Sequence, residues 1–134
     1  MNHTVCLDHV AIQTSDLDKA IFFYVNILGG DLKERRPFKT RHMAWIQFPN
    51  LKLEIFSKRQ NEELATWQDN YCGPVHLSFV VRDLDGFIAD AKALGACFHP
   101  SHPTPFIPPV AGAPRIAYLL GPDGEEVEVR PSAA

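Results

Sequence analysis

The chain has 134 residues, of which 46% are hydrophobic and 22% charged, and its formal net charge at pH 7 is −3. This length and this hydrophobic content are enough for one globular unit with a buried core. The small negative charge argues against binding to nucleic acid or to a membrane surface, and no apolar run approaches the roughly 20 residues of a membrane-spanning helix.

Two segments of the chain resemble each other. Residues 7–30 read LDHVAIQTSDLDKAIFFYVNILGG, and residues 74–96 read GPVHLSFVVRDLDGFIADAKALGA. In both, a histidine is followed seven residues later by Asp-Leu-Asp, after His9 in the first copy and after His76 in the second. The histidines lie 67 residues apart, half of the chain length. We infer a tandem duplication in which two equivalent strands each carry a histidine.

The first copy begins with an alternating strand in which His9, Ala11 and Gln13 share one face. Ser15 or Asp16 can cap the helix that follows, because these side chains accept hydrogen bonds from free backbone N–H groups. We expect this helix to bury a stripe at helical spacing and to end at Gly29-Gly30. The stripe consists of Leu17, Ala20, Ile21, Tyr24 and Leu28. Extended stretches are predicted at about 31–36, 42–49 and 51–57.

The second copy repeats this order. Its strand starts near His76, Asp83 can cap its helix, and Gly95 ends that helix. Extended stretches follow at about 96–100, 114–120 and 125–130, the last after the turn signal of residues 121–124. Residues 61–70 could form a short helix. Residues 100–114 contain six prolines and are predicted to be a lid or interface loop.

The sequence therefore predicts an α+β fold with two tandem βαβββ modules that form curved mixed sheets. We expect a single domain over residues 1–134, with module one at about 1–58, a linker at about 59–73 and module two at about 74–134. The first residues, Met-Asn-His-Thr, do not resemble a targeting segment. The three cysteines, an odd number without Cys-x-x-Cys spacing, are typical of reduced thiols in a cytoplasmic protein.

One carboxylate in each half lies between hydrophobic residues, Glu54 within Leu-Glu-Ile and Glu128 within Val-Glu-Val. Strand alternation puts each acid on the face away from the helix, which is also the face of His9 and His76. A carboxylate in such surroundings costs desolvation free energy unless it is paired or coordinated. Two imidazoles and two carboxylates suit a divalent transition metal with open positions for water and substrate.

Other polar residues have simpler interpretations. An isolated strand histidine is usually structural, and we expect this of His3, His42, His99 and His102. Glu125 is predicted to be exposed. Three arginines are expected to be solvated, with the grip of an anionic substrate as the less favoured alternative. They are Arg35, Arg36 and Arg41.

In these residues the chain resembles the vicinal-oxygen-chelate superfamily, which contains glyoxalase, bleomycin-resistance proteins and extradiol dioxygenases. The resemblance covers nearly the whole chain. The similar segments are residues 8–12, 16–20, 23–24, 28–29, 53–55, 76–81, 122–124 and 127–129. It implies a metal cavity enclosed by the modules, usually in a homodimer.

The resemblance also implies a ligand set of His9, Glu54, His76 and Glu128. A ligand set with both acids is similar to that of the glyoxalase I and epimerase branch, whereas extradiol dioxygenases lack an equivalent of Glu54. Bacterial glyoxalase I commonly has an arginine at the position of Gln13, an asparagine at that of Lys58 and an aspartate at that of Gly121. These three differences argue against glutathione as a substrate component.

The resulting hypothesis is a metal-dependent, glyoxalase-like lyase or isomerase that acts on a small vicinal-oxygen substrate, with a thiol adduct as one option. A divalent ion (Zn, Ni, Co, Mn or Fe, with Zn or Ni favoured) would polarise a carbonyl and stabilise an enediolate. Glu128 first, and Glu54 second, would move the proton. The alternatives are an extradiol-type Fe(II) dioxygenase and a bleomycin-resistance-like binding protein. We expect a cytoplasmic homodimer without nucleic-acid or membrane partners.

Overall fold

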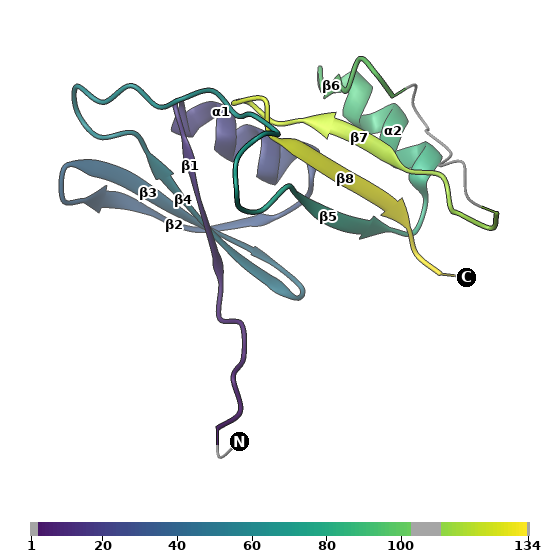
Figure 1. The fold of residues 1–134 in the computed structure, drawn as a ribbon, viewed down its shortest axis with the longest axis horizontal. Helices are drawn as coiled ribbons and strands as arrows, with labels where there is room; N and C mark the ends of the chain where they lie inside the picture. Colours follow the sequence, from purple (N-terminus) through teal and green to yellow (C-terminus); the bar gives the residue numbers. More distant parts are fainter. Residues whose placement is uncertain (1–2, 103–110, 134) are drawn as a thin grey trace. The chain divides into compact units, whose positions relative to one another are not determined.

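The structure, a computed structural model, describes residues 3–102 and 111–133. It is an α+β fold with two four-stranded mixed sheets (Figure 1). This confirms the predicted pair of βαβββ modules. The chain divides into two compact units between Leu64 and Ala65, inside the expected linker. No helix in the described part of the chain is long and apolar enough to cross a membrane.

The first unit contains the first βαβββ module. Its sheet has the order β1-β4-β3-β2, with β1 parallel to β4 and the other neighbours antiparallel. The elements are β1 (Val10–Thr14), α1 (Leu17–Ile21), η1 (Phe22–Ile27), β2 (Asp31–Phe38), β3 (Arg41–Phe48) and β4 (Leu51–Ser57).

The first helix begins as predicted and then changes its pitch. The Asp16 carboxylate caps α1 by accepting a 3.1 Å hydrogen bond from the Lys19 N–H. From Phe22 the helix is a π-helix, whose wider turn shifts the buried face. Phe23 and Tyr24 are consequently both buried, whereas Ile21 and Leu28 of the predicted stripe are only half-buried. The left-handed Gly29 (φ +83°) follows the end of this helix, as expected.

The second unit repeats the arrangement with the sheet order β5-β8-β7-β6. The Asp83 carboxylate caps its helix through the Gly86 N–H at 3.0 Å, and Gly95 (φ +82°) follows the end of that helix, both as predicted. The elements are β5 (His76–Val81), α2 (Leu84–Ala93), β6 (Cys97–Phe98), β7 (Ala117–Leu120) and β8 (Glu126–Pro131).

Each unit has its own core between helix and sheet. In the first unit Leu53 and Ile55 of β4 are fully buried, and in the second unit Val127 and Val129 of β8 are. These are alternate strand positions, so the residue between them, Glu54 or Glu128, faces the other side of its sheet. The core thereby fixes the direction in which both carboxylates point.

Some expectations about the connections were wrong. Residues 61–70 form no helix, and Asn61, the first residue of this segment, takes the left-handed conformation (φ 61°). The strands flanking the proline-rich segment are shorter than predicted, since Pro100 and Pro114 cannot donate backbone hydrogen bonds to a sheet. Residues 103–110 of the predicted lid or interface loop lie outside the described residues.

Candidate metal centre

The two units place their acids in the same register. In the first sheet Glu54 of β4 pairs with Ala11 of the parallel strand β1, and in the second sheet Glu128 of β8 pairs with Ser78 of β5. Each partner lies two positions after the repeated histidine, so histidine and acid share one face of their sheet. The structure therefore brings His9 to Glu54 and His76 to Glu128, as alternation predicted.

In the first unit the imidazole of His9 lies between two carboxylates. Its Nε2 is 3.6 Å from Glu54 Oε1, and its Nδ1 is 2.7 Å from Asp8 Oδ2. The hydrogen bond to His9 is the main cause that lowers the pKa of Asp8, helped by the charges of Lys52 and His9. The edge of the His9 ring meets the ring of Trp45, with centroids 4.9 Å apart. Asp8 and Trp45 together orient the imidazole.

This arrangement fits a cation. A carboxylate can only accept, so the hydrogen bond to Asp8 puts the proton of a neutral His9 on Nδ1 and leaves a lone pair on Nε2. That lone pair and the Glu54 carboxylate face each other at 3.6 Å without a hydrogen between them. Two facing acceptors of this kind suit a bound metal ion. A carboxylate on the outer nitrogen is also the usual support of a metal-bound histidine.

In the second unit the equivalent pair has different neighbours. His76 Nε2 lies 3.5 Å from Glu128 Oε2, while Ser78 Oγ donates a 3.0 Å hydrogen bond to Glu128 Oε1. Arg130 Nε is 3.5 Å from the same Oε1, and Glu128 is only 7% exposed. Burial, followed by the charge of Glu128, raises the pKa of Tyr118, which pairs with Glu128 across β7 and β8. Glu128 is thus a buried carboxylate with one oxygen occupied by Ser78.

Neither pair grows into a larger cluster within its unit. Among residues 3–102 and 111–133, no group of three or more His, Cys, Asp or Glu side chains is arranged to hold a metal ion. Asp8 belongs to the outer nitrogen of His9 and does not converge with Glu54. Each unit therefore offers a half-site of one imidazole and one carboxylate, and the four-ligand set stays a prediction.

The remaining described histidines lie outside these pairs. Both ring nitrogens of His99 are used: Nδ1 accepts a hydrogen bond from the Ser101 N–H at 3.1 Å, and Nε2 lies 3.3 Å from Glu126 Oε1. His102 stacks on His99 with a centroid distance of 4.8 Å. This is the structural role expected for these two residues. Because the backbone occupies its Nδ1 and a carboxylate its Nε2, His99 has no lone pair to offer to a metal.

Glu125 corrects one expectation. It is not exposed: its Oε1 is buried without a hydrogen-bond partner among the described residues, and its Oε2 accepts a weak bond from the Asp123 N–H at 3.3 Å. Burial, then the charge of Asp123, raises the pKa of Glu125 to about 7. The carboxyl occupies the space left by Gly121, where a Cβ atom would overlap it. The absence of a side chain at Gly121 creates this site.

Four residues around the pairs were missed at the level of sequence: Asp8, Trp45, Ser78 and Tyr118. Trp45 pairs with Glu54 across β3 and β4 as Tyr118 pairs with Glu128 across β7 and β8, so an aromatic residue adjoins each acid. Superimposing the two sheet registers would have revealed this symmetry. Trp45 also lines a cavity of about 340 Å³ together with residues of β2, β3 and β4. These are Lys33, Glu34, Ile46, Gln47 and Lys52.

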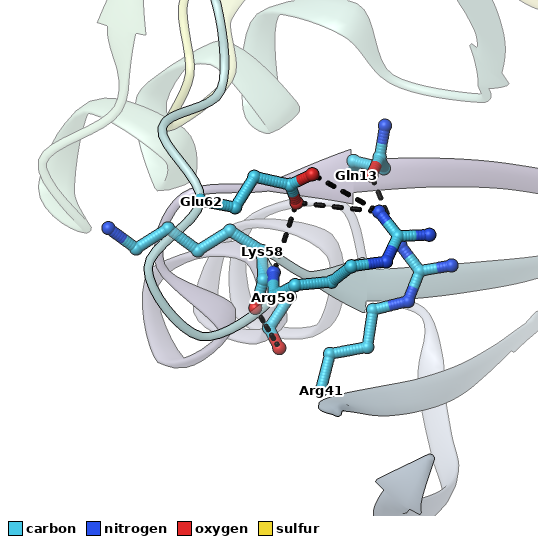
Figure 2. A network of polar contacts seen from close by, with 6 residues as sticks. Gln13, Arg41, Lys58, Arg59 and Glu62 are labelled. Atoms are coloured by element: carbon cyan, nitrogen blue, oxygen red, sulfur yellow. Dashed lines mark hydrogen bonds and ion pairs between the residues drawn. The ribbon is translucent and has the colours of Figure 1, made fainter. Parts of the chain in front are cut away.

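The arginines have different environments. Arg35 and Arg36 are exposed and form ion pairs of 2.7 Å with Asp18 and Glu34, as expected of solvated side chains. Arg41 is half-buried, and its Nη1 donates a 3.1 Å hydrogen bond to Gln13 Oε1 (Figure 2). Gln13 shares the face of His9, so Arg41 lies toward the same side of the first sheet.

Comparison with known proteins agrees with this architecture. Residues 6–129 match the family model of the Glyoxalase/Bleomycin resistance protein/Dioxygenase superfamily. Human mitochondrial methylmalonyl-CoA epimerase is 31% identical over 91 residues, which are 64% of this chain and 52% of that protein. The match thus spans about half the length of that relative.

Solved structures share the fold. A glyoxylase/bleomycin resistance protein/dioxygenase domain from Frankia sp. EAN1pec has a TM-score of 0.78 at 21% identity, covering 98% of this chain and all of that one. A variant of glyoxalase I from Zea mays has a TM-score of 0.74 at 22% identity, covering 94% of this chain and 44% of that one. A fosfomycin resistance protein from Listeria monocytogenes, solved with Mn(II) and sulfate, has a TM-score of 0.70 at 18% identity, covering 98% and 95%.

Fold and half-sites together define a protein of paired βαβββ modules with a histidine and an acid in matching register. The chain belongs to the Glyoxalase/Bleomycin resistance protein/Dioxygenase superfamily. Members of this superfamily include glyoxalase I and fosfomycin resistance proteins, and most are metal-dependent enzymes.

Proposed function

We propose that this protein is a metal-dependent, glyoxalase I-like lyase or isomerase that moves a proton between neighbouring carbons of a small substrate with adjacent oxygens. One observation carries the proposal. Both units hold a histidine and a carboxylate in the same register, with Nε2 3.6 Å from the acid in the first and 3.5 Å in the second. A metal site built from two repeats would draw such a matched pair of imidazole and carboxylate from each of them.

The proposed ligands are His9, Glu54, His76 and Glu128, and the proposed ion is a divalent transition metal, with zinc or nickel favoured over cobalt, manganese or iron. When bound, such an ion supplies Lewis-acid polarisation of a carbonyl oxygen. The donor chemistry supports this choice, since neutral imidazole nitrogens and carboxylate oxygens suit these ions and no thiol lies in either pair. The Mn(II) in the related fosfomycin resistance protein adds support from the fold.

The proton transfer is assigned to Glu128 first and Glu54 second. Glu128 is buried, and the Ser78 hydroxyl fixes one of its oxygens, so the other oxygen has a defined direction. A positioned carboxylate of this kind is what general-base catalysis requires. The likeness to an epimerase is consistent with proton transfer at a carbon atom. The substrate is a small molecule, with a thiol adduct among the options.

The first test is metal content. Protein purified without added metal should contain a stoichiometric ion, and His9→Ala and His76→Ala should each lose it at neutral pH. His99→Ala and His102→Ala are matched controls from outside the two pairs and should keep the ion, because His99 already uses both nitrogens and His102 stacks on it. Stoichiometric metal in the His9/His76 double variant would refute the site.

The second test separates binding from chemistry. Glu128→Gln keeps size and one oxygen but removes charge and basicity, so it should reduce turnover by about 10²–10⁴-fold while weakening the metal only modestly. Glu54→Gln should show a smaller effect. Turnover is measured as thioester formation from methylglyoxal and glutathione and as epimerisation of methylmalonyl-CoA, with oxygen uptake on catechols as the test for a dioxygenase. Near-wild-type turnover of metal-replete Glu128→Gln would move the base to Glu54.

A further inference from the structure

The guanidinium of Arg41, at the first residue of β3, is held in place by two different contacts. Its Nη1 donates a 3.1 Å hydrogen bond to Gln13 Oε1 (Figure 2). Its Cζ lies 4.1 Å from the ring centroid of Phe56. A guanidinium on an aromatic face keeps its edge free for hydrogen bonds. These contacts involve one of its five N–H donors, so the fork that matches a carboxylate or phosphate stays available.

Arg41 lies on the side of the first sheet that carries the His9–Glu54 pair. Glu54 pairs with Ala11, and Phe56, two residues further along β4, pairs with Gln13. These four residues therefore point to the same face. Two residues along a strand correspond to about 7 Å, so the guanidinium above Phe56 is displaced by about this distance from the level of Glu54.

Neighbouring acids do not neutralise Arg41 directly. Within the described residues Arg41 forms no ion pair, whereas Arg35 is paired with Asp18 at 2.7 Å. Glu62 is close enough to feel the charge of Arg41, but hydrogen bonds and ion pairing with Arg59 are the larger causes that lower its pKa, and its Oε2 is 3.2 Å from Arg59 Nη1. Glu62 is thus committed to Arg59.

We propose that Arg41 is a recognition site for an anionic group, a carboxylate or a phosphate, carried by the substrate about 7 Å from the oxygens that face His9 and Glu54. This inference rests on the proposed function, because it assigns a substrate class to the same face of the sheet. The substrate is then an acid whose adjacent oxygens and whose negative charge lie at opposite ends. Gln13 and Phe56 act as positioning residues that hold the guanidinium.

Three probes of matched length test the proposal on the metal-replete protein. All share an α-hydroxy acid end with adjacent oxygens: 2-hydroxyglutarate has a carboxylate at the far end, 3-phosphoglycerate a phosphate, and 2-hydroxyvalerate an uncharged methyl group. Calorimetry should show that one of the anionic probes binds at least about 10-fold tighter than 2-hydroxyvalerate, as expected for charge-assisted hydrogen bonds. The better of the two anionic probes identifies the group.

Arg41→Gln should abolish this preference and leave the affinity for 2-hydroxyvalerate unchanged. Arg41→Lys keeps the charge without the planar fork and should retain only part of the preference. Arg35→Gln is the matched control, because it removes an arginine that is already paired with an acid. An unchanged preference in folded Arg41→Gln would overturn the proposal, as would equal affinities of all three probes for the metal-replete wild type.

A second readout does not need the metal. In metal-free protein, inorganic phosphate should shift the Nε–Hε resonance of Arg41 more than that of Arg35. If the metal site proves wrong but this selective shift is seen, the anion site stands and the proposed function falls. If neither the shift nor the preference of the anionic probes for the wild type is seen, the anion site itself is refuted.

Discussion

The wild-type protein should lose stability as the pH rises, because Glu125, in the turn before β8, must ionise in a mostly buried place. Glu125→Gln should remove this pH dependence. The carboxyl of Glu125 is mostly buried beside Gly121, and burial raises its pKa from the usual 4.5 to about 7. The folded state thus binds this proton more tightly than the unfolded chain. The stabilisation is complete below pH 4.5 and is lost as the pH rises through 7.

The size of this effect follows from the two pKa values. A rise from 4.5 to about 7, at about 1.4 kcal/mol for each tenfold change, corresponds to about 3 kcal/mol. Water that reaches the partly exposed carboxyl screens it, so this is an upper figure. Glutamine resembles the protonated acid in size and neutrality. The variant should therefore match the wild type near pH 4.5 and exceed its stability by up to about 3 kcal/mol at pH 8.

Urea unfolding of both proteins between pH 4.5 and 8 measures this difference. The exposed Glu63 provides a control, since Glu63→Gln should leave the pH dependence unchanged. Gly121→Ala gives an independent check: the added Cβ would displace the Glu125 carboxyl into water, and the backbone of Gly121 allows alanine. Its pH profile should then become like that of Glu125→Gln. Parallel profiles for the wild type and Glu125→Gln would contradict the burial argument.

Two further predictions concern the metal and the assembly. Asp8→Asn should weaken metal affinity by about 10–100-fold in a chelator competition, because Asp8 orients His9 through the 2.7 Å contact to Nδ1. Asp18→Asn, which changes a carboxylate paired with Arg35, should not weaken it. Equal affinities would leave Asp8 without a role. The protein should also form a homodimer at micromolar concentration, and light scattering that gives a monomer of 15.0 kDa would contradict this.

Much of the fold could be predicted because the duplication presents each signal twice. Asp16 and Asp83 cap helices at equivalent positions, and Gly29 and Gly95 end them, so each interpretation supports the other. What failed lies where a local feature has no counterpart in the other copy. The π-helix from Phe22 is a local change of helical pitch, and residues 61–70 form no helix; hydrophobic periodicity registers neither feature.

The sequence predicted the directions in which the side chains of the site point, but not the residues that surround them. Strand alternation places Glu54 and Glu128 on the faces of His9 and His76, because the buried residues on either side leave an acid no other direction. Alternation says nothing about contacts across strands. The approach of Trp45 to His9 and the burial of Glu125 beside Gly121 depend on register and on the path of a turn.

In our proposal, the features that the two half-sites share bind the metal, and the features in which they differ select the base. Metal binding needs the same donors from each unit, and the shared register supplies them. Proton transfer needs one acid to differ from the other. At the position that pairs with the acid, the first unit has Ala11, which cannot donate a side-chain hydrogen bond, while the second has Ser78, whose hydroxyl holds Glu128 Oε1 at 3.0 Å. Because Glu128 is the one of these two acids whose oxygen a Ser hydroxyl holds, its Oε2, which faces His76, keeps one direction, and the duplicated fold thereby has a single preferred base.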